Sequence, residues 1–368
     1  MTAHSPAAPE GSILTPNGWV TGKVEFAGRT ISAVDGRMTA AGAKPKGPFV
    51  LPGFIDLHVH GGGGGDWQGG EEGVRTFVRY HASCGTTVMA PTTAIGSIPV
   101  IEKSLSAITS IAAVRLPGEA VVLGAHLEGP FINPLKPGAM AASLILEGDA
   151  ALARSWAEKF KIVIATVAPE VLGGLDVTKA LAEMGCRVQI GHSIATPLVT
   201  EEAFHCGCSG FTHLFNAMSP LQGRQPGMVG AIYDNNDVRC SVVCDGVHVD
   251  FASIRISKKI MQERLFFITD AVTEVSYGEY VHVFKGDRYT LPDGTLSGSS
   301  LTMIQCVRNG VEKCGFPLLE ALRMASLYPA RLMGEDSRLG SIHIGAKADL
   351  VLLDEELNLQ QVIVDGER

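Results

Sequence analysis

Eight short apolar runs, rich in β-branched residues, recur along this chain of 368 residues. They begin at Phe54 and follow one another about every 20 to 40 residues, with amphipathic stretches typical of helices in most of the gaps. This alternation predicts a parallel sheet, because successive parallel strands need a crossover connection that is usually a helix. The predicted strands are Phe54–His60, Thr86–Ala90, Val121–His126, Ile162–Val167, Arg187–Ile190, Gly210–Leu214, Cys240–Cys244 and Leu265–Thr269.

Eight parallel strands covered by helices can close on themselves, so we predict an α/β fold with a (β/α)8 TIM-type barrel. An open doubly wound sheet is the alternative. The two ends of the chain instead show short alternating stretches typical of antiparallel strands. We therefore expect a small β-sandwich domain from residues 1–52 and 335–368, and a barrel domain from residues 53–334. A hairpin pattern within Tyr280–Ser300 predicts an active-site flap.

Charge and composition exclude several classes of partner. The net charge is −8 and no run of lysine or arginine occurs, so we expect no nucleic-acid and no membrane partner. The polar start Met1–Gly11 does not resemble a signal peptide, and a cytoplasmic protein is expected. The eight cysteines are expected to be reduced core residues. The pairs Cys206/Cys208 and Cys240/Cys244 lack the C-x2-C spacing of structural zinc sites.

Two motifs imitate other enzyme classes but fail on spacing. The glycines at 61–65 would need a further glycine where Asp66, Trp67 or Gln68 stands, so they do not form a dinucleotide-binding loop. We expect them to form a flexible loop that allows close approach beside the site. The stretch from Gly191 to Ala195 lacks the final glycine of a nucleophile elbow, which argues against a serine hydrolase.

The residues that carry chemistry fall at the ends of the predicted strands. His58 and His60 are two residues apart in the first strand, so both side chains lie on one face. The other strand ends supply Glu128, His192, His213 and Asp270. Barrel enzymes draw their catalytic groups from the carboxyl ends of different strands, so we expect these side chains to meet at one mouth.

The types of these residues point to metal-assisted hydrolysis. One carboxylate and two imidazoles form a catalytic metal set, and Glu128, His192 and His213 fit it. A metal there would lower the pKa of a bound water to about 7 and polarise a carbonyl group. Amide hydrolysis also needs a group that moves a proton to the departing nitrogen, and Asp270 is the expected group. A helix cap or a further metal ligand is its alternative role.

Longer motifs agree with this interpretation. Pro52-Gly-Phe-Ile-Asp-Leu-His-Val-His60 resembles the first-strand signature of the amidohydrolase superfamily. The remaining motifs resemble, in order and spacing, the N-acetylglucosamine-6-phosphate deacetylases of that superfamily: His126-Leu-Glu-Gly-Pro-Phe131, Gly191-His-Ser193, Thr212-His-Leu-Phe-Asn-Ala-Met218, Asp245-Gly-Val-His-Val-Asp250, Thr269-Asp-Ala271 and Leu296-Ser-Gly-Ser-Ser-Leu-Thr-Met303. The resemblance implies hydrolysis of N-acetyl-D-glucosamine 6-phosphate to D-glucosamine 6-phosphate and acetate. The galactosamine epimer is an alternative substrate.

The resemblance also implies a metal assignment. Glu128, His192 and His213 would hold a tightly bound divalent metal, most often Zn²⁺, with Fe²⁺, Co²⁺ or Mn²⁺ as alternatives. His58 and His60 allow a second ion, so one or two ions are expected per subunit. Asp270 would be the general base and acid.

The substrate contacts come from the same resemblance. Asn216 and Ala217 would contact the sugar phosphate, Arg224 and His248 its phosphate group, and Met303 would line the acetyl side. Many relatives carry a histidine that orients the acyl carbonyl where this chain has Met140, and methionine cannot donate a hydrogen bond. A homodimer, in which a neighbour's arginine reaches the phosphate, is implied as well.

Three other functions remain as alternatives. A cyclic-amide hydrolase would carry a lysine after the fourth strand, but Val167-Ala-Pro-Glu170 has none. An N-acyl-D-amino-acid deacylase would need no phosphate pocket, and Arg224 and His248 argue against it. A non-catalytic metal-binding scaffold is the least expected, because it would have no need for the full set of ligands and proton carrier.

Overall fold

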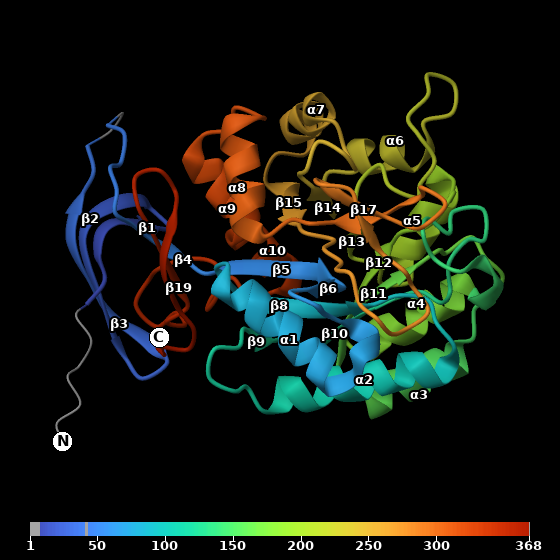
Figure 1. Ribbon diagram of the computed structural model, residues 1–368. Helices are drawn as coiled ribbons and strands as arrows, with labels where there is room; N and C mark the ends of the chain where they lie inside the picture. The colour runs from blue at the N-terminus through green and yellow to red at the C-terminus, as the bar shows by residue number, and fades with distance from the viewer. Residues whose placement is uncertain (1–7, 41–42, 368) are drawn as a thin grey trace.

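The computed structural model describes residues 8–40 and 43–367, and its centre is a ring of eight parallel strands (Figure 1). The ring strands are β5 (Phe54–Val59), β8 (Thr86–Thr93), β10 (Ala125–Glu128), β11 (Ile162–Val167), β12 (Arg187–Ile190), β13 (Gly210–Phe211), β14 (Arg239–Val243) and β15 (Leu265–Ile268). A helix follows each strand in turn: α1 (Gly70–Ser83), α2 (Ile98–Ala113), α3 (Ala150–Lys159), α4 (Gly174–Glu183), α5 (Pro197–His205), α6 (Gly227–Asp234), α7 (Phe251–Met261) and α8 (Met303–Glu312).

The order of the strands confirms the barrel and rules out the doubly wound sheet. Every neighbour in the sheet is the next strand of the ring along the chain, from β5 through to β15. The ring then closes where β15 ends beside β5. The backbone N–H of Asp270 donates to the carbonyl oxygen of His58 at 2.9 Å, and His60 donates to Ala271 at 2.9 Å. All residues of β5 and β8 are buried, because helices cover one face and barrel side chains the other.

Six of the eight predicted strands differ from the structure in their bounds, and two of these differences have a clear local cause. The predicted strand 121–126 is divided into β9 (Val121–Val122) and β10. Gly124 separates them with φ of 152°, and a side chain there would lie 2.6 Å from the carbonyl oxygen of Lys161. The predicted strand 210–214 ends early at Phe211, because the chain turns out of the sheet at His213, where φ is 37°.

Both ends of the described chain join one six-stranded sheet beside the barrel (Figure 1). Its strands are β1 (Glu10–Thr15), β2 (Gly18–Ala27), β3 (Thr30–Met38), β4 (Phe49–Pro52), β19 (Leu350–Leu353) and β20 (Leu359–Ile363). The expected β domain from both termini is therefore confirmed, and its strands form a single continuous sheet. The domain boundaries given above stay a prediction, and residues 1–7, 41–42 and 368, which include most of the polar start, lie outside the described residues.

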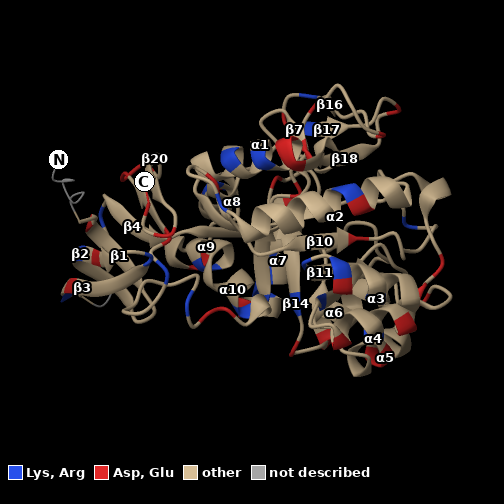
Figure 2. Ribbon diagram, turned by 90° about the horizontal axis from the view of Figure 1, so that it is seen from below, with Lys and Arg blue, Asp and Glu red and all other residues tan. Residues whose placement is uncertain are grey.

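The predicted hairpin is a three-stranded sheet inserted between β15 and α8. It contains β16 (Val283–Phe284), β17 (Arg288–Thr290) and β18 (Leu296–Ser299), and we call residues 280–300 the flap. In Figure 2 its strands lie next to β7 (Gly65–Asp66). The glycine run forms β6 (Gly61–Gly62) and β7, which pack against α1 so closely that a side chain at Gly65 would lie 2.4 Å from the carbonyl oxygen of Gly73. The close packing of this backbone against α1, rather than phosphate binding, explains why glycine occurs here.

Helix ends follow local capping rules, and the surface is mixed in charge. The Asp149 carboxylate caps α3 through Leu152 N–H, and the Thr196 hydroxyl caps α5. After α8 come α9 (Leu318–Ala325) and α10 (Leu327–Met333), which ends at Gly334 with φ of 71°. Figure 2 shows acidic and basic residues interspersed over the helices. Within residues 8–40 and 43–367, no helix is both long and apolar enough to span a bilayer.

The cysteines are free thiols, and we expect few of them to react in the folded protein. Six of the eight are buried, and only Cys84 and Cys206 are partly exposed. Burial raises the pKa of Cys186 to about 11 and that of Cys208 to about 12, so neither supplies thiolate at pH 8. A colorimetric thiol titration should find at most two reactive groups in the native protein and eight after unfolding. Rapid native reaction of more than two would contradict this packing.

Candidate active site

A cavity of about 200 Å³ opens at the carboxyl ends of the barrel strands. Its walls combine imidazole and carboxylate groups from the strand ends with apolar side chains from the rim and the flap. The lining residues are His60, Trp67, Ala94, Glu128, Gly138, Ala139, Met140, His192, His213, Asn216, Ala217, His248, Asp270, Val272, Tyr280, His282, Leu296 and Ser297.

Three of the residues predicted from the strand ends share an unusual backbone conformation. His192, His213 and Asp270 each lie two residues beyond the end of a strand, with φ of 48°, 37° and 50°. Residues other than glycine rarely adopt positive φ, because the Cβ atom crowds the backbone, and such residues gather at functional sites. Each residue leaves its strand at this point and contributes its side chain to the same cavity.

The first metal-binding group joins Glu128, His192 and His213. The Nε2 atom of His213 lies 3.0 Å from Glu128 Oε1 and 3.1 Å from Nε2 of His192. His192 Nε2 lies 3.2 Å from the same carboxylate oxygen. All three side chains are buried, and their ligand atoms lie within 4.8 Å of one another. Such a set of nitrogen and oxygen donors suits a divalent metal.

The outer hydrogen bonds of the imidazoles fit this function. His192 Nδ1 lies 2.8 Å from the carbonyl oxygen of Lys136, and His60 Nδ1 lies 3.2 Å from that of Thr92. A carbonyl oxygen only accepts, so each Nδ1 carries the proton and each Nε2 keeps its lone pair for the cavity. The imidazole lone pairs and the Glu128 carboxylate point to the same buried place, and a bound cation there would give all of them a partner. The side chains present therefore fit a metal.

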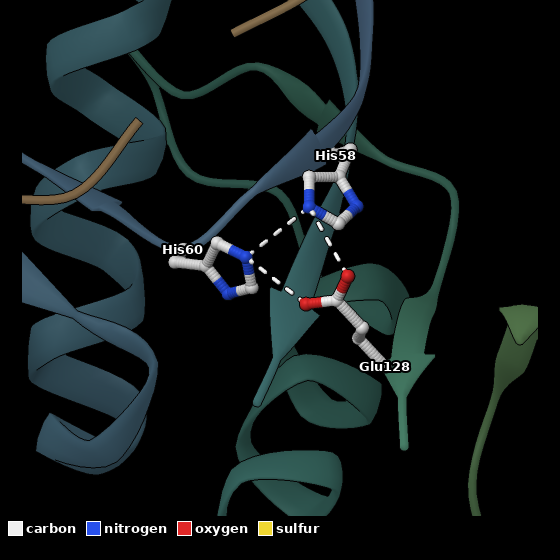
Figure 3. Close-up of side chains that lie close together, drawn as sticks. All are labelled: His58, His60 and Glu128. Atoms are coloured by element: carbon white, nitrogen blue, oxygen red, sulfur yellow. Dashed lines mark hydrogen bonds and ion pairs between the residues drawn. The ribbon is translucent and has the colours of Figure 1, made fainter. Parts of the chain in front are cut away.

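A second group shares Glu128 with the first (Figure 3). His58 Nε2 and His60 Nε2 are 3.2 Å apart. They lie 3.7 Å and 3.4 Å from the two oxygens of the Glu128 carboxylate, which points between them. Burial alone would raise the pKa of Glu128, but its electrostatic and hydrogen-bonding interactions with the neighbouring imidazoles, His58 and His192 foremost, outweigh burial and hold this pKa well below its ordinary value. Glu128 is thus an anion common to both groups.

Asp270 faces the second group from the opposite wall. Its Oδ1 atom lies 3.4 Å from Nε2 of both His58 and His60, and its Oδ2 atom lies 3.8 Å from Nε2 of His248. Burial would raise the pKa of Asp270, but its electrostatic interactions with the neighbouring imidazoles, His58 and His60 foremost, hold it well below its ordinary value. The carboxylate is therefore ionised at neutral pH, as a general base must be.

A buried aspartate that the sequence reasoning passed over joins the two strands that carry these groups. Asp56 Oδ2 accepts a hydrogen bond of 2.5 Å from the Thr269 hydroxyl, and Oδ1 accepts from the backbone N–H groups of His58 and Thr269 at 3.3 Å. Burial raises the pKa of Asp56 to about 7, with the bonds from Thr269 and His58 acting against it. Asp56 ties the end of β5 to the end of β15.

The predicted substrate contacts divide into two sets. Asn216, Ala217, His248 and Met140 line the cavity. Met303 and Arg224 do not line it. Met303 is fully buried in the core at the start of α8, and Arg224 is exposed between β13 and α6.

Nine of the lining residues were not assigned to the site from the sequence, and three of these carry aromatic or imidazole rings. Trp67 follows β7, whereas Tyr280 and His282 belong to the flap. The hairpin pattern predicted the flap, but only its packing over the barrel mouth brings these side chains into the cavity. No strand or helix period marks them.

Glu170, after β11, ties three neighbouring loops together behind His192. Its carboxylate accepts hydrogen bonds from Asn133 Nδ2 at 2.8 Å, the Ser193 hydroxyl at 2.6 Å and the Ile194 N–H at 2.7 Å. The N–H of Asn133 in turn donates to the carbonyl oxygen of His192 at 2.9 Å. Glu170 therefore fixes the loop that orients a metal ligand.

Replacement of Glu170 by glutamine should loosen this loop, because the amide has one acceptor oxygen in place of two. We expect the free energy of unfolding to fall by about 1–3 kcal/mol and metal affinity to fall by about 10- to 100-fold. Denaturant unfolding and a competitive metal-chelator titration measure the two effects. Glu147→Gln, at an exposed position, is the matched control. Unchanged metal affinity in Glu170→Gln would show that the loop holds His192 without this carboxylate.

Comparisons with known proteins give a consistent result. Residues 49–368 match the model of the Amidohydrolase family. An N-acetylgalactosamine-6-phosphate deacetylase of Escherichia coli O157:H7 is 34% identical, over 96% of this chain and 97% of the relative. An N-acetylglucosamine-6-phosphate deacetylase of Bos taurus is 33% identical, over 97% of this chain and 92% of the relative. The crystal structure of N-acetylglucosamine-6-phosphate deacetylase from Pasteurella multocida superposes with a TM-score of 0.88 at 29% identity, covering 97% of both chains.

Proposed function

Because the chain belongs to the amidohydrolase family, we propose that it hydrolyses the acetamide of N-acetyl-D-glucosamine 6-phosphate to D-glucosamine 6-phosphate and acetate. The observation that carries this proposal is that Glu128, Asp270 and three imidazoles of the two metal-binding groups line one cavity, with His58 Nε2 3.4 Å from Asp270. The relatives named as deacetylases of amino-sugar 6-phosphates align over nearly the whole chain and support the substrate class.

A divalent metal is the expected cofactor. Glu128, His192 and His213 would hold it, and His58 and His60 would share Glu128 to hold a second ion. When bound, such a metal supplies Lewis acidity towards a carbonyl oxygen and an acidified water. Zn²⁺ is our first choice, although histidine and carboxylate sites also accept Fe²⁺, Co²⁺ and Mn²⁺.

Asp270 carries the proton in this scheme. Its carboxylate accepts a proton from the attacking water as the new C–O bond forms at the acetyl carbon. It then gives that proton to the amide nitrogen as the C–N bond breaks, so that the sugar leaves as an amine and the acetyl group as acetate. His58 and His60, each 3.4 Å from Asp270, orient the carboxylate for both transfers.

The phosphate end is proposed to lie towards Asn216, Ala217 and His248. Their position on the cavity wall supports this placement. His248 Nδ1–H donates to Asp245 Oδ2 at 2.6 Å, which orients the ring, and Nε2 donates to a phosphate oxygen when the ring carries its second proton. Arg224 is exposed and absent from the lining of its own subunit's cavity, which fits an arginine supplied by the second copy of a homodimer.

Arg224→Ala should raise KM for the phosphorylated sugar by about 10- to 100-fold, because a charge-assisted hydrogen bond is lost. Steady-state kinetics measure this, with the exposed Arg37→Ala as control. Mixing Arg224→Ala with Asp270→Asn tests the dimer. If the arginine acts across the interface, each mixed dimer regains one complete site and activity returns. If activity does not recover although the subunits are shown to exchange, Arg224 acts in the active site of its own subunit or in neither site.

The test of the proposed function is acetate release by metal-reconstituted protein from four compounds. These are N-acetylglucosamine 6-phosphate, its galactosamine epimer, unphosphorylated N-acetylglucosamine and an N-acetyl-D-amino acid. We expect the highest kcat/KM with the glucosamine phosphate. Preference for the acetylated amino acid would overturn the substrate while leaving the metal chemistry, and no hydrolysis of any amide would favour a non-catalytic scaffold.

The galactosamine epimer is the second candidate, because a relative of that name is 34% identical to this chain. The two sugars differ in the orientation of one hydroxyl group. A site with a hydrogen-bonding group at that hydroxyl could separate them strongly. The same four-compound panel decides between them. The cytoplasmic location expected from the sequence belongs to this proposal and stays a prediction.

A further inference from the structure

Hydrogen bonds hold the start of the flap over the cavity, and the polar atoms that make these bonds are not free to bind a ligand. The Tyr280 hydroxyl donates to the carbonyl oxygen of Ile95 at 2.5 Å and accepts from the Ala141 N–H at 3.3 Å. The backbone N–H of Glu279 donates to the side-chain oxygen of Gln68 at 2.7 Å. These bonds hold the start of the flap against three separate rim segments, so the residues that follow it have a defined position.

His282 follows two residues later and lines the cavity. Its ring lies parallel to that of Tyr280, with an interplanar angle of 11° and centroids 6.2 Å apart. Its Nδ1 atom lies 3.0 Å from the hydroxyl oxygen of Ser297, on β18. One nitrogen is therefore occupied, and the ring has little freedom to turn. The Nε2 atom has no hydrogen-bond partner among the residues that the structure describes.

His282 differs chemically from several other residues that line the cavity. Met140, Val272 and Leu296 present thioether or hydrocarbon surface, and the Tyr280 hydroxyl is already engaged. A ligand that reaches the metal-binding end of the cavity thus meets, on the flap, a polar ring with one free nitrogen. Burial and the nearby His60 lower the pKa of His282 to about 4, against the raising effect of Asp270, so the ring is uncharged at neutral pH. A neutral imidazole can donate one hydrogen bond without adding positive charge beside a cation site.

We propose that His282 is a substrate-binding residue whose Nε2–H donates a hydrogen bond to the carbonyl oxygen of the bound acetamide, with Ser297 fixing the tautomer and ring orientation. When the Ser297 hydroxyl donates to Nδ1, the ring proton stays on Nε2 and faces the cavity. The acetamide oxygen gains negative charge as water adds to the carbonyl carbon, so this hydrogen bond strengthens towards the transition state. The assignment rests on the proposed deacetylase function and names a contact within that site.

The test compares two substitutions at this position. His282→Phe keeps the ring and its place beside Tyr280 but removes both nitrogens, and His282→Gln retains a donor near the Nε2 position. We expect His282→Phe to lower kcat/KM for the acetylated sugar phosphate by about 10- to 100-fold, mainly through kcat, at unchanged metal content. His282→Gln should recover part of the loss. Ser297→Ala should cause a smaller loss, because it removes only the group that orients the ring.

Two further measurements separate this role from a structural one. His205→Phe, at an exposed position on α5, is the control for loss of a histidine. Imidazole ¹⁵N resonances of the wild-type protein should place the His282 proton on Nε2, and Ser297→Ala should alter that tautomer balance. The proposal is overturned if kcat/KM of His282→Phe stays within twofold of the wild-type value. It is also overturned if the fall in kcat/KM is matched by an equal fall in bound metal. It also fails if kcat/KM of His282→Gln is no higher than that of His282→Phe. Absence of turnover in the wild type would instead overturn the deacetylase function on which it rests.

Discussion

Replacing Asp270 with asparagine is expected to lower kcat by about 100- to 10,000-fold, the range typical of a lost general acid–base group, while the metal stays bound. Asparagine keeps the shape of the side chain and an oxygen near His58 and His60, but it cannot accept the proton of the attacking water. Glu128, His192 and His213 are unchanged, so the first metal-binding group is preserved. Acetate release and metal analysis by mass spectrometry on the same sample measure both properties.

The control for this experiment is Asp176→Asn, in the first turn of α4 and exposed to solvent. It should match the wild type in both activity and metal content. Near-normal turnover in Asp270→Asn would remove Asp270 from the proton-transfer role. Loss of metal together with activity would instead show that Asp270 acts as a metal ligand, the alternative role considered for it.

Replacing Glu128 with glutamine should have a still broader effect, because this carboxylate belongs to both metal-binding groups. Glutamine removes the negative charge that offsets the cation and leaves one oxygen donor in place of two. Losing a residue behind a metal ligand costs about 10- to 100-fold in affinity or activity, so losing a shared ligand should cost about 1,000-fold or more. We expect little bound metal and almost no acetate release at saturating substrate.

The fold should survive this change. Glutamine keeps the size of the side chain, so the circular dichroism of metal-free Glu128→Gln should match that of metal-free wild type. Its thermal midpoint should fall, because the favourable interactions of the buried Glu128 anion with the surrounding imidazoles are lost. Glu201→Gln, at an exposed position on α5, is the matched control. Full metal occupancy with retained activity would contradict the shared role of Glu128. If one ion is lost and one kept, the two groups bind metal independently.

A large part of this molecule follows from local sequence pattern. The eight apolar runs and the helical stretches between them predict the barrel, because strand and helix periods are properties of neighbouring residues. The period of two places His58 on β5 and His60, just beyond its end, on one face, and closure of the ring brings the ends of β10, β12, β13 and β15 to one mouth. The structure accordingly brings Glu128, His192, His213 and Asp270 together with this pair.

Other features were decided only by the tertiary structure. Glu128 is shared by two metal-binding groups because the barrel closes β5 against β15, which no pattern within a single strand specifies. The positive φ values of His192, His213 and Asp270 arise where the chain leaves each strand under the constraint of its neighbours. Met303 lies in the core and Arg224 outside the cavity, although the family resemblance implied a substrate contact for both.

The flap illustrates the physical reason. Pro292-Asp293-Gly294 predicts a turn from local conformational preference alone. The position of His282 depends on the Tyr280 hydroxyl, which donates to Ile95 O and accepts from Ala141 N–H, residues 185 and 139 positions away along the chain. Sequence period therefore determined which side chains the strand ends present to the mouth of the barrel. Long-range packing decided which loops cover them and which of their polar atoms remain free for a substrate.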